Sequence, residues 1–114
     1  MNLENSKAQM RKGILELCIL GIIDAEKEVY PSDIIARMKE AELIVVEGTL
    51  YPLLSRLMKG GLLDYSWVES KSGPPRKYYK LTENGKLHLK ELKKTWGTLS
   101  QSVATITQNT QNHE

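Results

Sequence analysis

The residues best suited to chemistry lie in one helix-sized stretch, residues 48–59. Reading base edges in the major groove of DNA requires a helix that carries short hydrogen-bonding side chains and cations on its free face. Those in this stretch are Thr49, Tyr51, Ser55, Arg56 and Lys59. The apolar residues between them recur at helical spacing, which predicts one buried stripe. An ordinary amphipathic surface helix has the same pattern, so the stretch alone does not decide between the two.

A basic turn follows this stretch after Gly60-Gly61. Strand-like runs at 63–67 and 77–81 flank a turn at residues 70–75, which predicts a hairpin. Cations and backbone N–H groups at a protruding tip suit phosphate contacts and entry into the minor groove. The residues concerned are Ser72, Gly73, Arg76 and Lys77. A turn without a binding role is the alternative, but a helix followed at once by a basic hairpin is a narrower pattern and predicts a winged helix-turn-helix.

Charge is divided along the chain although the net charge of the 114 residues is only +2. Residues 24–47 hold seven acidic and three basic side chains, whereas residues 48–80 hold six basic and two acidic ones. A basic segment in a nearly neutral chain can give one face of the molecule a positive potential. Scattered, solvated lysines would give the same count.

Other chemistries find little support in the sequence. The two histidines, His88 and His113, have no metal-ligand partner at a useful spacing, and there is no phosphate-binding glycine loop or nucleophile motif. We therefore expect no enzyme activity, no cofactor and no metal site. Cys18 is the single cysteine, which fits a reducing compartment. The apolar run at 14–23 is too short to span a bilayer, so we expect a cytoplasmic protein without a membrane partner.

The elements that must position these residues are mostly helices. Ser6 begins a capping-box pattern that predicts a first helix to about Ala25. Pro31 suits the first position of a second helix, which ends near Ala41. The apolar residues 43–46 predict an extended link before the helix that begins near Gly48, and Thr82 is a plausible N-cap for the last helix.

The last helix carries an apolar seam whose members are three and four residues apart in turn. They are Leu89, Leu92, Trp96, Leu99, Val103 and Ile106. Such a heptad spacing is typical of a helix that packs along another helix. Packing onto its own domain is one reading. A second copy of the chain is the other, and we favour it because the seam continues far beyond the hairpin.

Several segments together resemble the PadR family of transcriptional regulators. The carriers are residues 13–17 with Leu20, the run Gly48 to Leu57, residues 60–63 and the run Arg76 to Gly85. This resemblance implies a winged-helix homodimer that binds operator DNA, often as a repressor. It implies that Thr49, Tyr51, Ser55 and Lys59 lie on the recognition helix and Gly73, Arg76 and Lys77 on the wing. One departure is Pro31, because the family usually has glycine after the tyrosine.

The resemblance also implies a role for the last helix. In small members of the family one C-terminal helix makes the dimer, and aromatic residues near that interface hold flat hydrophobic ligands in some of them. Trp96 is then either a ligand-binding residue for a small aromatic or hydrophobic effector or a large apolar anchor of the interface.

We therefore expect a mainly α fold with a small β-hairpin: a winged helix-turn-helix plus a long C-terminal dimerisation helix. The expected divisions are a DNA-binding domain at 1–81, the dimerisation helix at 82–108 and a disordered tail at 109–114. The expected function is a transcriptional regulator, a repressor that binds a pseudo-palindromic site on double-stranded DNA as a homodimer and is released by a hydrophobic ligand. The alternative is a winged-helix module that binds another protein and does not bind DNA.

Overall fold

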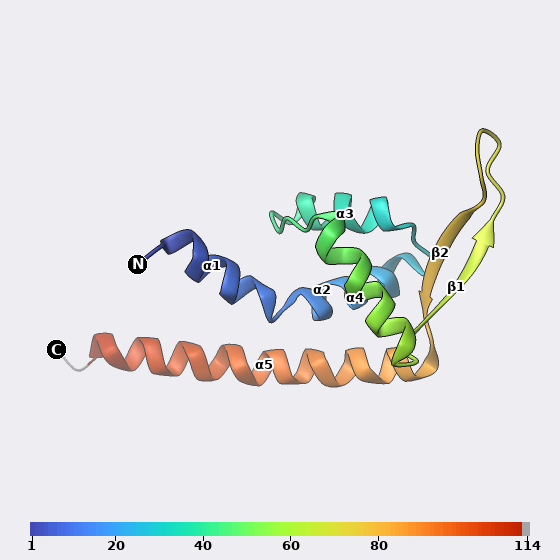
Figure 1. The fold of residues 1–114 in the computed structure, drawn as a ribbon. Helices are drawn as coiled ribbons and strands as arrows, with labels where there is room; N and C mark the ends of the chain where they lie inside the picture. The colour runs from blue at the N-terminus through green and yellow to red at the C-terminus, as the bar shows by residue number, and fades with distance from the viewer. Residues whose placement is uncertain (113–114) are drawn as a thin grey trace.

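Five helices and one hairpin form the part of the chain that the structure describes. The computed structural model describes the backbone of residues 1–112 and the side chains of residues 1–108. In order, the elements are α1 (Leu3–Lys12), α2 (Leu15–Glu26), α3 (Pro31–Glu40), α4 (Glu47–Lys59), β1 (Leu63–Val68), β2 (Arg76–Leu81) and α5 (Glu83–Asn112). Helix α5 runs along one side of the molecule, and the hairpin projects from the opposite end to the two termini (Figure 1). The predicted fold class, a mainly α winged helix-turn-helix with a long last helix, is confirmed.

The N-terminal region differs from the prediction of one helix capped by Ser6. Two helices are present, and the first is capped by Asn2, whose Oδ1 accepts hydrogen bonds from the N–H groups of Glu4 and Asn5 at 2.9 and 3.3 Å. The break falls at Gly13 and Ile14, where the φ and ψ angles of Ile14 are −104° and −2°, displaced from the regular α-helical values of about −63° and −42°. Glycine has a low helix propensity, which favours a break there. The break directs α1 away from the core, and none of its residues is buried.

Helices α2, α3 and α4 form the helix-turn-helix core. Pro31 occupies the first position of α3, where its missing N–H has no partner to lose. Proline in place of the glycine that is usual in similar sequences therefore leaves the start of α3 regular. Residues 43–46 form the predicted link to α4, which carries Pro52 within its first turns.

The two strands pair in antiparallel register from Leu63 opposite Leu81 to Val68 opposite Arg76. Val29, in the loop before α3, extends this sheet by a bridge to Tyr79, with two backbone hydrogen bonds of 3.0 and 2.8 Å. The hairpin is thus hydrogen-bonded to the loop between α2 and α3, in addition to its covalent connections to α4 and α5.

One apolar core joins these elements. It is built from buried side chains of α2, α3 and α4, of both strands and of the first turns of α5. Its fully buried members are Ile19, Leu20, Ile23, Ile34, Leu50 and Leu54. Leu89 belongs to the same core and is 3% exposed. The first turns of α5 therefore pack in the same core as the helix-turn-helix.

The start of α5 is fixed to the end of α4. The hydroxyl of Thr82 donates a hydrogen bond of 2.6 Å to the carbonyl of Gly61, and its backbone N–H donates to the carbonyl of Leu62 at 3.0 Å. The same hydroxyl accepts from the N–H of Gly85 at 3.0 Å, which confirms Thr82 as the predicted N-cap. Gly85 packs directly against the carbonyl of Leu62, and a Cβ at this position would overlap the carbonyl oxygen.

Helix α5 continues to Asn112, four residues past residue 108, where the sequence predicted it to end. The expected tail, residues 109–114, includes residues 113 and 114, which lie outside the described residues. None of the described helices combines the length and the apolar character needed to cross a bilayer.

Replacing Gly85 with alanine should destabilise the protein because the new methyl group would force α5 away from Leu62. We expect a loss of about 2 kcal/mol of unfolding free energy, as for an overpacked core position, and a fall in Tm of roughly 5–10 °C. Thermal unfolding followed by circular dichroism measures this change.

Gly97→Ala is the matched control on the same helix, because a Cβ there meets nothing within 4 Å. It should leave the Tm unchanged or raise it, since alanine is the better helix former by about 1 kcal/mol. An equal effect of the two variants would show that the contact of Gly85 with Leu62 does not hold α5 in place.

Candidate nucleic-acid interface

Helix α4 presents two different exposed flanks on either side of its buried stripe. Leu50, Leu53, Leu54 and Leu57 are buried, and with 3.6 residues per turn the remaining positions divide between the flanks. Tyr51, Ser55 and Lys59 are exposed together on one flank. Thr49 and Arg56 lie on the other flank, beside a groove between α4, α2 and α5. The five residues predicted to read DNA are therefore spread over the whole exposed side of α4.

Arg56 is engaged within the chain. Its Nη2 atom lies 3.4 Å from Oε1 of Glu16 on α2, and the other oxygen of that carboxylate lies 3.0 Å from Nε2 of His88 on α5. The Arg56 side chain is 70% exposed, so this ion pair contributes little to stability. It does direct the guanidinium towards α2 and α5, away from the flank that carries Tyr51.

Tyr51 is the aromatic side chain on the free flank of α4, and it is 45% exposed. Partial burial raises the pKa of the Tyr51 phenol, and the Glu47 carboxylate and the phenols of Tyr30 and Tyr79 raise it further. The phenol is thus neutral at physiological pH and keeps its O–H as a hydrogen-bond donor.

The hairpin carries the cations that the sequence assigned to the wing. Ser72 and Gly73 lie in the exposed turn, whereas Arg76 and Lys77 begin β2. Lys77 is half-buried, and its Nζ atom lies 4.0 Å from the centre of the Tyr65 ring. The Arg76 guanidinium lies 5.0 Å from the centre of the Tyr30 ring. Both cations are thus held by aromatic rings along the strand rather than at the tip.

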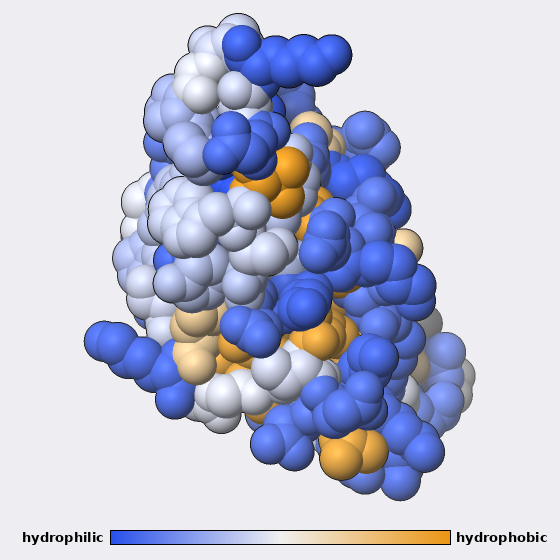
Figure 2. Space-filling view, turned by 90° about the vertical axis from the view of Figure 1, so that its right-hand side faces the viewer, coloured by the Kyte–Doolittle hydropathy of each residue, from blue (hydrophilic) through white to orange (hydrophobic). Residues whose placement is uncertain are grey.

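The surface at the hairpin end carries both charged side chains and exposed aromatic ones, since Tyr65 and Trp67 of β1 are 37% and 62% exposed. Figure 2 shows hydrophilic and intermediate surface over the hairpin and the adjoining helices, with only small, separate hydrophobic patches. Cations that are held by aromatic rings on this surface suit an anionic partner.

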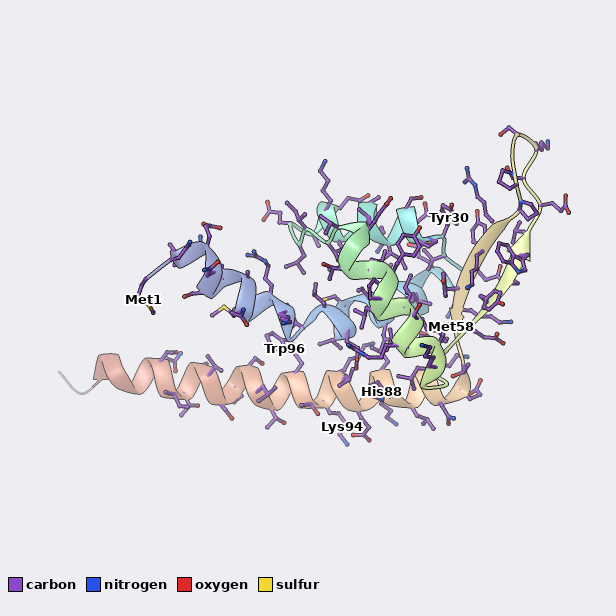
Figure 3. All side chains as sticks on the ribbon, viewed as in Figure 1. Met1, Tyr30, Met58, His88, Lys94 and Trp96 are labelled. Carbon is purple, nitrogen blue, oxygen red and sulfur yellow. The ribbon has the colours of Figure 1, made fainter. Side chains whose placement is uncertain are left out.

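The seam of α5 divides into a buried and an exposed part. Leu89 is in the chain's own core and Leu92 packs against it, so these two side chains serve the domain itself. Trp96, Leu99, Val103 and Ile106 are 48%, 55%, 58% and 67% exposed. Trp96 points from α5 towards the junction of α1 and α2, on the same side as His88 and opposite Lys94 (Figure 3).

A groove of about 410 Å³ lies where α5 faces α2 and α4. Apolar residues make most of its wall: Ile14, Leu15, Pro52, Leu92, Trp96 and Leu99. Glu16 and Arg56 stand at its polar edge. The groove therefore connects Trp96 to the ion pair that directs the Arg56 side chain of α4.

Metal binding has no obvious site in the described part of the chain, where no three His, Cys, Asp or Glu side chains are grouped to hold an ion. Burial raises the pKa of the Cys18 thiol, so the less reactive protonated form dominates at neutral pH.

Three residues that matter at these sites were missed by sequence reasoning. Glu16 and His88 are 72 positions apart, and no local pattern connects them. Tyr30 was considered only as the residue before Pro31. The only sequence signal for Tyr30 was that it is an aromatic residue at the start of a helix. The sequence did not indicate its contact with Arg76, which is distant along the chain.

Comparison with known proteins gives a consistent result. The family model described as the transcriptional regulator PadR-like family matches residues 19–91. A PadR-like transcription factor from Bacteroides fragilis is 57% identical, with 90% of this chain and 98% of that chain covered and a TM-score of 0.74. A PadR family regulator from Eggerthella lenta is 28% identical, with 91% and 90% covered and a TM-score of 0.84.

A further similar structure is that of Bacillus subtilis PadR in complex with operator DNA. It is 26% identical to this chain, with a TM-score of 0.63. The match covers 69% of this chain and 45% of that one.

Proposed function

The chain belongs to the PadR-like family of transcriptional regulators, and from this premise we propose that it binds operator DNA as a homodimer and represses transcription. Each protomer would place the flank of α4 that carries Tyr51, Ser55 and Lys59 in a major groove. The hairpin would contact the flanking phosphates through Arg76, Lys77 and the backbone of its turn. Such a function would place the protein in the cytoplasm, with the DNA.

One observation carries this proposal. The exposed flank of the second helix of a helix-turn-helix lies beside a hairpin whose cations are held in place by aromatic rings. Phosphate contacts of this kind position a protein on DNA, and side chains on the helix then read the bases. A winged-helix module that binds only proteins would not need cations at the wing, which makes that alternative the weaker one.

Binding to the promoter of the protein's own gene should depend strongly on salt. With several phosphate contacts in each protomer, we expect the affinity to fall about a hundredfold or more between roughly 50 and 200 mM salt. Combining Arg76→Ala with Lys77→Ala should weaken binding to all duplexes and reduce the salt slope by about one for each phosphate that the variant no longer neutralises. Fluorescence anisotropy of a labelled duplex measures both quantities.

Lys90→Ala combined with Lys94→Ala removes the same charge from α5 and serves as the control. Lys94 projects from the side of α5 opposite Trp96 (Figure 3). This control should keep the salt slope of the unmodified protein. If it lowers the slope as much as the hairpin variant, general electrostatic attraction accounts for binding and the proposed wing contacts do not exist.

The proposed dimer rests on the exposed part of the α5 seam. Trp96, Leu99 and Val103 are large apolar side chains at heptad spacing, each about half exposed. Burial of such a stripe against a second α5 would remove its apolar surface from water. Twofold symmetry would then give two copies of α4 directed at half-sites about one helical turn apart, or a multiple of it.

Leu99→Lys should break this dimer because two symmetry-related charges would lose their water in the same interface. We expect a rise of at least about a hundredfold in the dimer dissociation constant, equal to roughly 3 kcal/mol. Analytical ultracentrifugation over a concentration series gives this constant.

Gln101→Lys adds the same charge two residues further on, where the helix turns it away from the seam, and it should leave the dimer intact. A stable Leu99→Lys dimer would contradict the seam as the interface. Equal dissociation of both variants would attribute the effect to charge alone.

The groove beside Trp96 supports a further part of the proposal, an effector that releases the DNA. Its apolar wall and its volume suit a flat aromatic molecule. Arg56 and Thr49 of α4 line the same groove, so a bound molecule would contact the helix that we propose reads DNA. A ligand shifts the equilibrium between DNA-bound and free protein only if it binds the two states with different affinity. Its contact with α4 would supply that difference in affinity.

A flat aromatic compound that binds the groove should quench the fluorescence of Trp96 and raise the Tm by a few degrees, because binding stabilises the folded state. Measurement in a Trp67→Phe background leaves Trp96 as the single tryptophan. Trp96→Leu should abolish the Tm shift if the ring forms part of the site. If compounds that quench Trp96 keep the same Tm shift in Trp96→Leu, they bind elsewhere and Trp96 is an apolar anchor only.

A further inference from the structure

Tyr30 lies where the helix-turn-helix meets the hairpin, and nothing in the proposed function yet gives it a role. It is the residue before α3, and it lies next to the start of β2 (Figure 3). We propose that Tyr30 is a positioning residue for DNA binding, whose ring holds the Arg76 guanidinium in the orientation that contacts a phosphate. This inference rests on the proposed function and assigns the means by which one of its contacts is ordered.

The contacts of Arg76 support this role. Its guanidinium carbon lies 5.0 Å from the centre of the Tyr30 ring. No carboxylate among the described side chains forms an ion pair with it, in contrast to Arg56. A guanidinium that lies over a ring face keeps its N–H groups free at the edge, and these groups match the oxygens of a phosphate. The stack therefore fixes the side chain without occupying the donors that DNA would use.

The Tyr30 ring is itself held in place. It packs against the Tyr78 ring, with 5.7 Å between centres and 44° between planes. Its backbone carbonyl accepts from the N–H of Asp33 at 2.9 Å, and its own N–H donates to Oδ2 of Asp33 at 3.3 Å. The residue before it, Val29, is bound to Tyr79 by two backbone hydrogen bonds. The ring that contacts Arg76 is thus held both by the loop before α3 and by strand β2.

Tyr30 also connects the wing to α4. Tyr30 directly precedes α3, and α3 packs against α4. The phosphate contact at Arg76 and the base-reading flank at Tyr51 are then set relative to each other through Tyr30. A wing helps to select a site only when it holds a fixed position relative to the recognition helix. Loss of the Tyr30 ring should therefore weaken DNA binding through the Arg76 contact specifically.

A double-mutant cycle on the full-length protein tests the inference, with a duplex of its own promoter as the probe. Tyr30→Leu should weaken binding about three- to fivefold, as expected for an exposed cation–π contact, and should lower the salt slope towards that of Arg76→Ala. In an Arg76→Ala background the same change should have no further effect. Tyr30→Phe keeps the ring and should bind within about twofold of the unmodified protein.

Two matched variants sharpen the cycle. Lys71→Ala removes a cation of the exposed turn, and its effect should multiply with that of Tyr30→Leu because the two sites are independent. Tyr30→Met is measured alongside Tyr30→Leu so that the cycle does not depend on one replacement, and thermal unfolding confirms that each variant is folded.

Three outcomes would overturn the inference. Equal weakening by Tyr30→Leu with and without Arg76 would mean that the ring acts through the fold in general. Equal weakening by Tyr30→Phe and Tyr30→Leu would mean that the hydroxyl contacts DNA directly. A normal salt slope in Tyr30→Leu would mean that the phosphate contact is independent of the ring. If the unmodified protein binds no DNA, the proposed function fails and the inference fails with it.

Discussion

The junction between α4 and α5 is the constraint on which the rest of the molecule depends. Thr82 binds the carbonyls of Gly61 and Leu62, and Gly85 allows the helix backbone to lie directly on that of Leu62. The end of α4 and the beginning of α5 therefore move together. Because α5 would carry the partner chain and α4 would read the DNA, this contact would set the angle between the two recognition helices of a dimer. The hairpin begins at the same junction, so its direction follows from it as well.

The two flanks of α4 give the helix two separate tasks. One flank, with Tyr51 and Ser55, is exposed to solvent. The other faces the groove beside Trp96, where Arg56 shares the Glu16 carboxylate with His88 of α5. Any molecule that enters this groove would meet the recognition helix and the proposed dimerisation helix at once. This arrangement would give a physical route from the proposed effector to the spacing of the proposed DNA-reading surfaces, without a change in the core.

The sequence was informative where structure is local. The helical spacing of the leucines in α4, Pro31 at a helix start, the turn residues of the hairpin and Thr82 as a cap all act within a few positions, and each was predicted correctly. The prediction of one N-terminal helix was wrong because the break at Gly13 and Ile14 depends on where the core ends. The contact of Arg56 with Glu16 joins residues forty positions apart, and the stack of Arg76 on Tyr30 spans a similar distance. Such pairs leave no pattern that a single sequence reveals.

The central claim is that this chain is one half of a symmetric DNA reader. Hydroxyl-radical footprinting of the protein on its own promoter tests it most directly. We expect two protected patches of similar size on one face of the duplex, about one helical turn apart or a multiple of it. Both patches should disappear together when the chain is diluted below its dimer dissociation constant. A single protected patch, or protection that survives in the monomer, would contradict the claim.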